Sequence, residues 1–189
     1  MWTNASSYVA GLTQALQRLD LHAVDRLAQA VHLAYLRRRT VFFIGNGGSA
    51  STASHLAAAF SKLTTRQARL RCMALVDSVA ALTAAGNDFA YEDVFVEQLR
   101  TFLEPGDVVV GISTSGRSRN VVRACRTARE HGLATIGMTG RGGPLADGAD
   151  LAFTVASDVT ARIQEAHLTL AHILCELVER ALFPEGVLP

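Results

Sequence analysis

Short runs of consecutive apolar residues alternate along this chain with longer segments whose apolar residues recur every three or four positions. The short runs are typical of strands buried on both faces, and they cover residues 40–44, 70–76, 108–112, 133–138 and 151–155. The periodic segments are typical of amphipathic helices, and they cover residues 4–19, 21–38, 50–62, 78–85, 92–103, 119–131 and 160–182. This order predicts an α/β fold with a parallel sheet flanked by helices.

Turn signals divide these elements without suggesting a linker between domains. Gly86-Asn87-Asp88 predicts a break between two helices, 140–144 predicts a glycine-rich turn, and Gly132 predicts the end of a helix. The 189 residues therefore predict a single domain over 1–189, with N-terminal helices over 1–38 and an α/β core over 39–184.

Composition and charge narrow the class of protein. The formal net charge of +1 gives no electrostatic case for binding nucleic acid or an anionic membrane. No apolar run approaches the ~20 residues that span a bilayer, and the first residues do not resemble a signal peptide. Cys72, Cys125 and Cys175 are odd in number and widely spaced, which predicts buried free thiols in a cytoplasmic protein. The apolar content of 49% suggests buried oligomer surface.

Two loops of serine and glycine follow two of the predicted strands, and each precedes a predicted helix. They are Gly45-Asn46-Gly47-Gly48-Ser49 and 113–118, with the sequence Ser-Thr-Ser-Gly-Arg-Ser. Backbone N–H groups and hydroxyls at a helix N-terminus favour an anion. The first loop alone is equally typical of a tight packing turn, but the four hydroxyls of the second exceed what helix capping needs. Neither loop has the lysine or glycine spacing of nucleotide-binding motifs, so we expect a phosphorylated small molecule.

Together these segments resemble the sugar isomerase (SIS) domain, and within it the phosphoheptose isomerases. The resemblance also rests on 86–89, on 106–108 and on Ala161-Arg162-Ile163-Gln164-Glu165-Ala166-His167. It implies a three-layer α/β/α fold and a homotetramer that interconverts sedoheptulose 7-phosphate and a heptose 7-phosphate at a bound zinc. The residues that it implies for binding the phosphorylated sugar are Asn46, Gly47, Ser49, Asp88, Ser113, Thr114, Ser115, Ser118 and Gln164.

The resemblance also implies a zinc site formed by His55, Gln164 and His172. By itself, His55 is more typical of a packed or capping histidine. The glutamate that the family uses as metal ligand and base is replaced here by Ala59, and a second pocket carboxylate is replaced by Ala161. Zinc with two imidazoles and an amide oxygen is chemically acceptable, but it is weaker than a site with an anionic ligand.

Helix geometry limits how these residues can meet. Gln164 and His172 are eight residues apart, hence ~80° around a helix and ~12 Å along it, so one metal would need long reach or ligands from two subunits. Isomerisation needs a base, and the candidates are Glu165, Asp88 and the two histidines His55 and His172. Glu165 points ~100° away from Gln164, and a glutamate there is also typical of an interface contact. His167 is expected at the helix surface or at an interface.

Three functions are consistent with the sequence. The first is an isomerase acting on sedoheptulose 7-phosphate, or on a related sugar phosphate, with a substituted base. The second is a non-catalytic tetramer that binds the replication initiator protein, as one family branch does; that branch also lacks the glutamate, and its C-terminus resembles Leu182-Phe183-Pro184. The third is a module that senses sugar phosphates without turnover.

Overall fold

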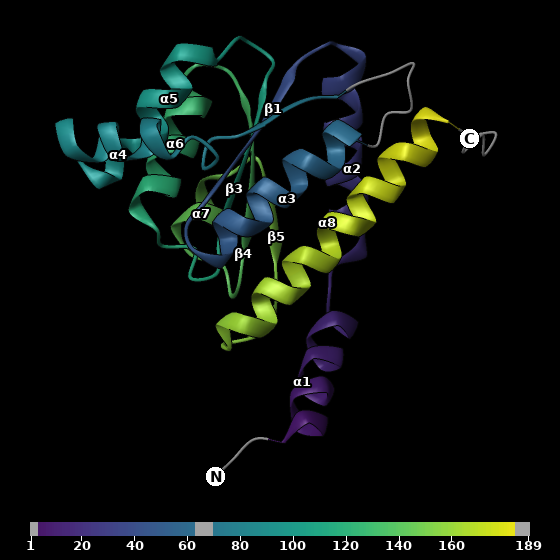
Figure 1. Ribbon diagram of the computed structural model, residues 1–189. Helices are drawn as coiled ribbons and strands as arrows, with labels where there is room; N and C mark the ends of the chain where they lie inside the picture. The colour runs from purple at the N-terminus through teal and green to yellow at the C-terminus, as the bar shows by residue number, and fades with distance from the viewer. Residues whose placement is uncertain (1–3, 63–69, 184–189) are drawn as a thin grey trace.

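A 5-stranded parallel sheet lies at the centre of the molecule, in the order β2-β1-β3-β4-β5 (Figure 1). The structure is a computed structural model that describes residues 4–62 and 70–183. The strands are β1 (Thr40–Gly45), β2 (Arg71–Ala74), β3 (Val108–Ser113), β4 (Ala134–Thr139) and β5 (Leu151–Thr154). Each strand pairs in parallel with its neighbour, so all the carboxyl ends meet at one edge.

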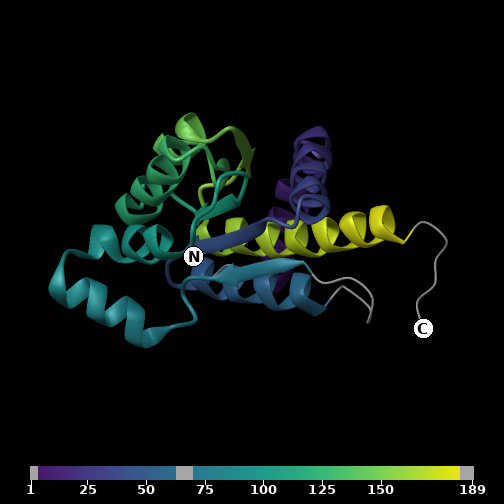
Figure 2. The same ribbon diagram turned by 90° about the horizontal axis from the view of Figure 1, so that it is seen from above.

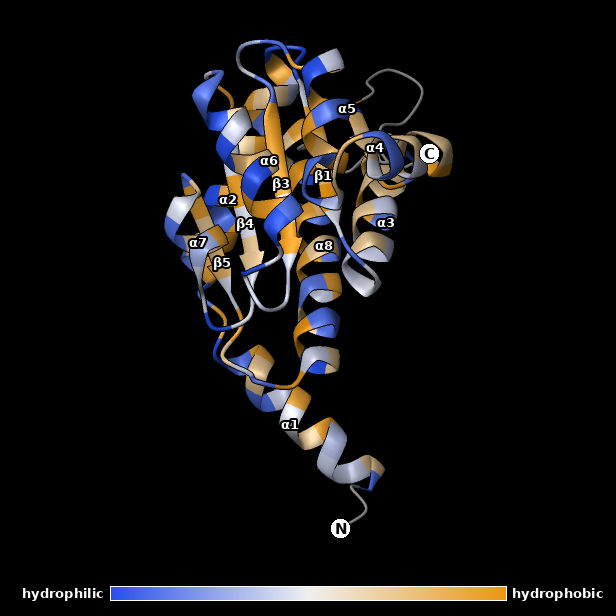
Figure 3. Ribbon diagram, turned by 90° about the vertical axis from the view of Figure 1, so that its left-hand side faces the viewer, coloured by the Kyte–Doolittle hydropathy of each residue, from blue (hydrophilic) through white to orange (hydrophobic). Residues whose placement is uncertain are grey.

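Helices cover both faces of the sheet and create two apolar cores. One face carries α2 (Leu21–Leu36), α3 (Gly48–Lys62) and α8 (Thr160–Leu182), and the other carries α5 (Val94–Phe102), α6 (Arg119–Glu130) and α7 (Pro144–Gly148). Alternate residues of one strand enter opposite cores: Phe43 packs with the first set and Phe42 with the second. In Figure 3 the hydrophobic strands β1 and β3 lie between these helical layers.

Two helices project from this three-layer body. α1 (Ala5–Gln17) packs against α8 and extends away from the sheet. α4 (Val79–Asp88) stands out beside α5, and the one-turn helix η1 (Tyr91–Asp93) joins the two. Seen from above, α3 and α8 run side by side (Figure 2). This pair brings together residues more than a hundred positions apart in the sequence.

The three-layer fold predicted from the sequence is confirmed, but one local prediction is wrong and one short helix is not predicted. Gly86-Asn87-Asp88 does not break the chain between helices, because these residues form the last turn of α4. The predicted turn at 140–144 is followed by α7, which begins at Pro144, a residue whose fixed φ suits the first helical position. Gly132 does end its helix, with a φ of 78°.

The described helices and the three cysteines bear on the predictions about membranes and thiols. None of the described helices is both long enough and apolar enough to cross a bilayer. All three cysteines are free; Cys125 and Cys175 are buried and Cys72 is half-buried. Burial raises the pKa of each thiol to about 12, so these thiols are protonated and unreactive near neutral pH.

Candidate functional site

The two serine-glycine loops lie next to each other at the carboxyl edge of the sheet. Gly45 at the end of β1 pairs with Ile112 at the end of β3, so the chain leaves both strands at the same level. Gly47 begins the turn into α3 with a φ of 55°, and Ser49 is buried in the first turn of that helix. Ligands of parallel α/β sheets bind at this edge, beyond the carboxyl ends of the strands.

Asn46, in the first loop, is held by an amide network. It exchanges two side-chain hydrogen bonds of 2.9 Å with Asn120 of α6, and its Oδ1 also accepts a 2.9 Å bond from the Tyr91 hydroxyl. Neither partner is among the residues predicted from the sequence. Asn120 is buried on the apolar face of an amphipathic helix, and a polar residue at such a position is the signal that could have revealed it.

The hydroxyls of the second loop converge. Ser113 Oγ lies 2.9 Å from Ser118 Oγ and 3.4 Å from Ser115 Oγ. Ser118 occupies the N-cap position of α6, yet its side chain makes no capping hydrogen bond. The cluster therefore does not serve the helix, in agreement with the expectation that these hydroxyls exceed the needs of capping.

A polar cavity of about 350 Å³, here called the hydroxyl cavity, opens beside this loop. It is lined by Thr114, Ser115, Arg117, Arg141, Gly142, Gly143, Ser157, Asp158, Thr160 and Ile163. The Arg141 guanidinium is paired with Asp158 at 2.6 Å. Gly116 lets the loop pack closely here, because a Cβ at that position would lie 1.9 Å from the Gly142 carbonyl oxygen.

A second cavity of about 420 Å³, here called the histidine cavity, lies between α3 and the start of α8. It is lined by Gly48, Ser51, Thr52, His55, Ala161, Gln164, Glu165 and Leu168. The Gln164 amide approaches the N-terminus of α3 so closely that a Cβ on Gly48 would lie 2.5 Å from its Nε2 atom. The two cavities flank the first turns of α8, since the consecutive residues Ile163 and Gln164 line one each.

Two predicted metal ligands meet above this cavity. The Nε2 atoms of His55 on α3 and His172 on α8 lie 2.9 Å apart, with the two exposed rings edge to face. Converging imidazole nitrogens suit zinc, and Gln164 offers an amide oxygen in the cavity that His55 lines. In the described part of the chain, no group of three or more His, Cys, Asp or Glu side chains could hold a metal. The donors on offer, two imidazoles and one amide oxygen, are ones that zinc accepts, but the site has no anionic ligand.

The two alanine departures both fall at this site. Ala59 lies one turn after His55 on α3, half-buried against the core that α3 shares with α8. Ala161 contributes to the wall of the histidine cavity. Neither methyl group can bind a metal or carry a proton, so both positions contribute only packing.

Glu165 is the single acidic residue in the lining of the histidine cavity. Residues 161, 164, 165 and 168 form one stripe of α8, so Gln164 and Glu165 share the cavity although they point ~100° apart. The Glu165 Oε2 atom is buried and has no hydrogen-bond partner among the residues that the structure describes. A carboxylate oxygen with unused acceptor capacity is a candidate proton carrier.

His167 is fully buried, so the prediction of a surface or interface position is wrong. Its Nε2–H donates to the carbonyl of Thr139 at 3.1 Å, at the carboxyl end of β4. Burial lowers the pKa of His167 to about 4, and the ring is therefore neutral. The neighbouring Gly140 N–H donates to the Thr114 carbonyl at 3.0 Å, so His167 joins α8 to the second serine-glycine loop, 113–118, here called the hydroxyl loop.

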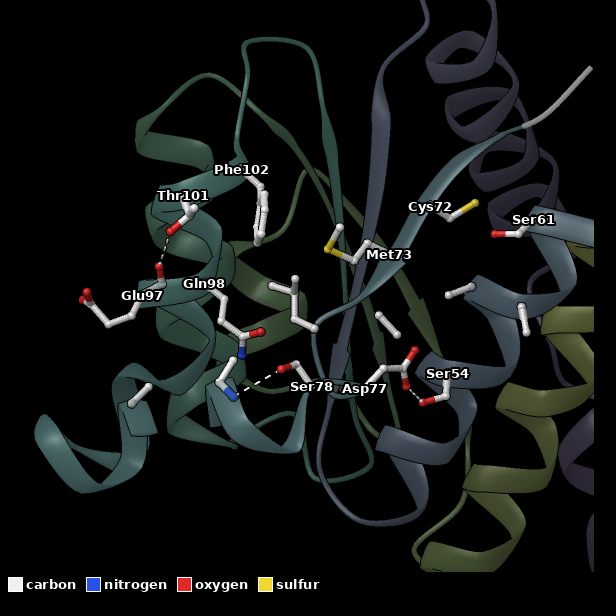
Figure 4. A pocket seen from close by; sticks show the side chains of 16 residues that line it. Ser54, Ser61, Cys72, Met73, Asp77, Ser78, Glu97, Gln98, Thr101 and Phe102 are labelled. Carbon is white, nitrogen blue, oxygen red and sulfur yellow. Dashed lines mark hydrogen bonds between the residues drawn. The ribbon is translucent and has the colours of Figure 1, made fainter. Parts of the chain in front are cut away.

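Asp88 and a third cavity lie apart from this arrangement. Asp88 is exposed at the end of α4, where its carboxylate accepts a 2.8 Å bond from Asn87. The cavity of about 650 Å³ in Figure 4 lies between α3, β2, α4 and α5. Ser54 donates a hydrogen bond to Asp77 at its rim. No residue predicted to bind sugar or metal lines it.

Comparisons with known proteins show the family to which the chain belongs. The family model of the SIS domain matches residues 7–140. The phosphoheptose isomerase of Solidesulfovibrio magneticus is 46% identical over 182 residues, covering 94% of this chain and 89% of that protein. The phosphoheptose isomerase of a Roseiflexus species is 47% identical over 161 residues, covering 84% and 82%. The solved phosphoheptose isomerase of Neisseria gonorrhoeae superimposes with a TM-score of 0.86 at 34% identity, covering 92% and 95%.

Proposed function

This chain belongs to the SIS-domain family as a sugar-phosphate isomerase of the phosphoheptose isomerase type, and we propose that it interconverts sedoheptulose 7-phosphate and D-glycero-D-manno-heptose 7-phosphate. The observation that carries this proposal is the pairing of two cavities across the start of α8. One is lined by hydroxyls of Thr114, Ser115, Ser157 and Thr160, and the other offers a carboxylate beside His55 and Gln164. A phosphorylated sugar needs both environments.

The hydroxyl loop receives the phosphate in this proposal. Ser113, Thr114, Ser115 and Ser118 supply O–H donors, and the start of α6 supplies N–H groups and the positive end of the helix dipole. The family resemblance assigns Asn46, Gly47, Ser49 and Asp88 to the sugar hydroxyls, although Asp88 lines neither cavity and lies exposed at the end of α4.

In the histidine cavity, the Glu165 carboxylate carries the proton between C1 and C2. It accepts the C1 proton of the ketose as the C1–C2 enediol forms, and it returns this proton to C2 to give the aldose. When no metal is bound to them, His55 and His172, whose ring nitrogens can each donate or accept, move the proton between O1 and O2. The site thus uses a glutamate on α8 where the family pattern has one on α3.

Zinc is the proposed cofactor, held by His55, His172 and Gln164. When bound, zinc polarises the sugar carbonyl as a Lewis acid. The absence of a carboxylate at Ala59 supports weaker binding than a site with an anionic ligand has.

A homotetramer in the cytoplasm is part of the proposal. Apolar side chains on the projecting elements support association, since Val79 is 70% exposed, Phe89 64% and Tyr91 63%. The three free thiols support a reducing compartment.

One observation favours a second function. Ala59 and Ala161 remove two carboxylates from the site, which suits a non-catalytic tetramer that binds the replication initiator protein or senses sugar phosphates. Of the C-terminal residues that supported this reading, Pro184 lies outside the described residues. Turnover of sedoheptulose 7-phosphate by the purified protein separates the two functions.

The phosphate assignment is tested with Ser115→Ala combined with Ser118→Ala. We expect this double variant to lose the rise in melting temperature that sedoheptulose 7-phosphate gives the wild type, because the converging donors are gone. A control with Ser6→Ala and Ser61→Ala, at two exposed serines elsewhere, should keep it. Equal stabilisation of the loop variant and the wild type would place the phosphate elsewhere.

A further inference from the structure

Six arginines lie between positions 117 and 141, and five of them are paired with an acidic side chain. In these pairs a guanidinium nitrogen lies 2.6–3.8 Å from a carboxylate oxygen, and the arginines are Arg119, Arg123, Arg126, Arg129 and Arg141. The sixth, Arg117, forms an ion pair with none of the residues that the structure describes. The exception is thus the arginine inside the hydroxyl loop, between Gly116 and Ser118.

Arg117 also carries the uncompensated charge of the hydroxyl cavity. It lines this cavity together with Thr114 and Ser115. The other charged residues of the lining are Arg141 and Asp158, whose charges cancel in their 2.6 Å ion pair. Two guanidinium groups and one carboxylate leave the lining with a net charge of +1. A polar cavity with this charge favours an anion, and a guanidinium can donate two parallel hydrogen bonds to the oxygens of a phosphate group.

Ser115 connects this cavity to the converging hydroxyls of the loop. Its Oγ atom lies 3.4 Å from Ser113 Oγ and accepts a 3.2 Å hydrogen bond from the Arg117 backbone N–H. Because the oxygen accepts this bond, its own proton remains to be donated. A single residue of the loop therefore belongs both to the hydroxyl cluster and to the wall of the cavity that Arg117 lines.

We propose that Arg117 determines the specificity of the site for phosphorylated sugars: its guanidinium binds the phosphate from the side of the hydroxyl cavity, while the loop hydroxyls bind it at Ser115. The inference rests on the proposed function, and it adds a charged ligand to a set of neutral O–H and N–H donors. Arg117 acts at the phosphate and not at C1 or C2. Its contribution is therefore equal in the bound substrate and in the transition state, so it lowers KM and leaves kcat unchanged.

The test compares kcat and KM for sedoheptulose 7-phosphate in the wild type, Arg117→Gln and Arg119→Gln. Arg119 is exposed and paired with Glu92, so its replacement removes the same charge at the start of α6 without changing the cavity lining. We expect Arg117→Gln to raise KM about ten- to a hundredfold with kcat within about twofold, since a hydrogen bond between charged groups is lost. Arg119→Gln should change neither value. An unchanged KM in Arg117→Gln, or an equal change in both variants, would overturn the proposal.

Binding of inorganic phosphate decides the role of Arg117 even if the wild type shows no turnover, a result that would refute the proposed function itself. Each melting temperature is measured with and without phosphate, so a change in intrinsic stability is separated from binding. We expect phosphate to raise the melting temperature of the wild type and Arg119→Gln, and to raise that of Arg117→Gln much less. Equal stabilisation of Arg117→Gln and the wild type, or stabilisation of neither, would overturn the proposal.

Discussion

At the scale of single residues, two alanines determine which side chains of this site can bind a metal or carry a proton. Ala59 and Ala161 stand where the family pattern has carboxylates, and both lie on elements that enclose the histidine cavity. With these side chains truncated, Glu165 is the acidic group left in the lining. A proton carrier on α8 in place of one on α3 is the direct consequence.

The first prediction restores one carboxylate. Ala59→Glu places an anionic ligand one helical turn from His55, so it should tighten zinc binding and raise the isomerisation rate. A general base contributes about 10²–10⁴-fold to a rate, so a clear gain is expected even from imperfect placement. Zinc titration and a coupled assay measure the two effects.

Ser61→Glu is the matched control, since Ser61 lines the separate cavity of Figure 4. It adds the same charge to the same helix, but six residues from His55 and ~120° away around the helix axis, so it does not reach that ring. Equal behaviour of the two variants would mean that position 59 has no special relation to the metal.

At the scale of elements, α8 organises the site. Its first turns separate the two cavities, Glu165 and Gln164 occupy one stripe, and His172 meets His55 two turns further on. His167 fixes the helix to the end of β4 by its bond to the Thr139 carbonyl. The angular position of α8 therefore depends on a neutral, buried imidazole.

This anchor predicts a pH dependence of stability. The pKa of His167 is lowered to about 4 in the folded protein, against about 6.5 when unfolded. Below pH 6.5 the unfolded chain binds a proton that the folded site rejects. The contribution of His167 to the free energy of unfolding is therefore fully present above pH 6.5. It is lost as the pH falls toward 4, and the loss reaches up to about 3 kcal/mol.

Urea unfolding of the wild type and His167→Gln between pH 7.5 and 4.5 measures this contribution. The wild type should lose stability more steeply than His167→Gln, because glutamine does not titrate. His22→Gln, at an exposed histidine of α2, should follow the wild-type curve. Parallel curves for the wild type and His167→Gln would show that the buried ring makes no such contribution.

The sequence predicted elements well where burial is uniform and less well near their ends. Strand runs such as Val108–Ser113 are buried throughout, and a continuous apolar run records this directly. Gly86-Asn87-Asp88 has poor helix propensity, yet it completes α4, because the last turn of an exposed helix tolerates such residues. Propensity describes the isolated segment and does not include the contacts of α4 with α5 and η1.

At the scale of the whole molecule, topology explains which parts of the site the sequence could indicate. The two serine-glycine loops follow parallel strands, so their meeting at one edge follows from strand order alone. The contacts of His55 with His172 and of Asn46 with Asn120 join residues 117 and 74 positions apart. Such contacts depend on how α3, α6 and α8 pack. No local pattern encodes that packing.

The exposed apolar surface leads to a prediction about assembly. Val79, Phe89 and Tyr91 project from α4 and the segment after it, where a monomer would leave them in water. We expect light scattering to give about four times the 20.2 kDa chain mass. Val79→Asp, which places a charge in the apolar patch, should shift the protein toward smaller species. A 20.2 kDa particle at micromolar concentration would contradict the tetramer.

The central claim is that Glu165 moves the sugar proton. The most direct measurement follows the C1 hydrogens of sedoheptulose 7-phosphate by NMR while the protein, with zinc, works in D₂O. The wild type should exchange a C1 hydrogen for deuterium, and Glu165→Gln should do so about 10²–10⁴-fold more slowly. Glu97→Gln, outside the site, should exchange at the wild-type rate. Exchange by Glu165→Gln at the wild-type rate, or none by the wild type, would contradict the account.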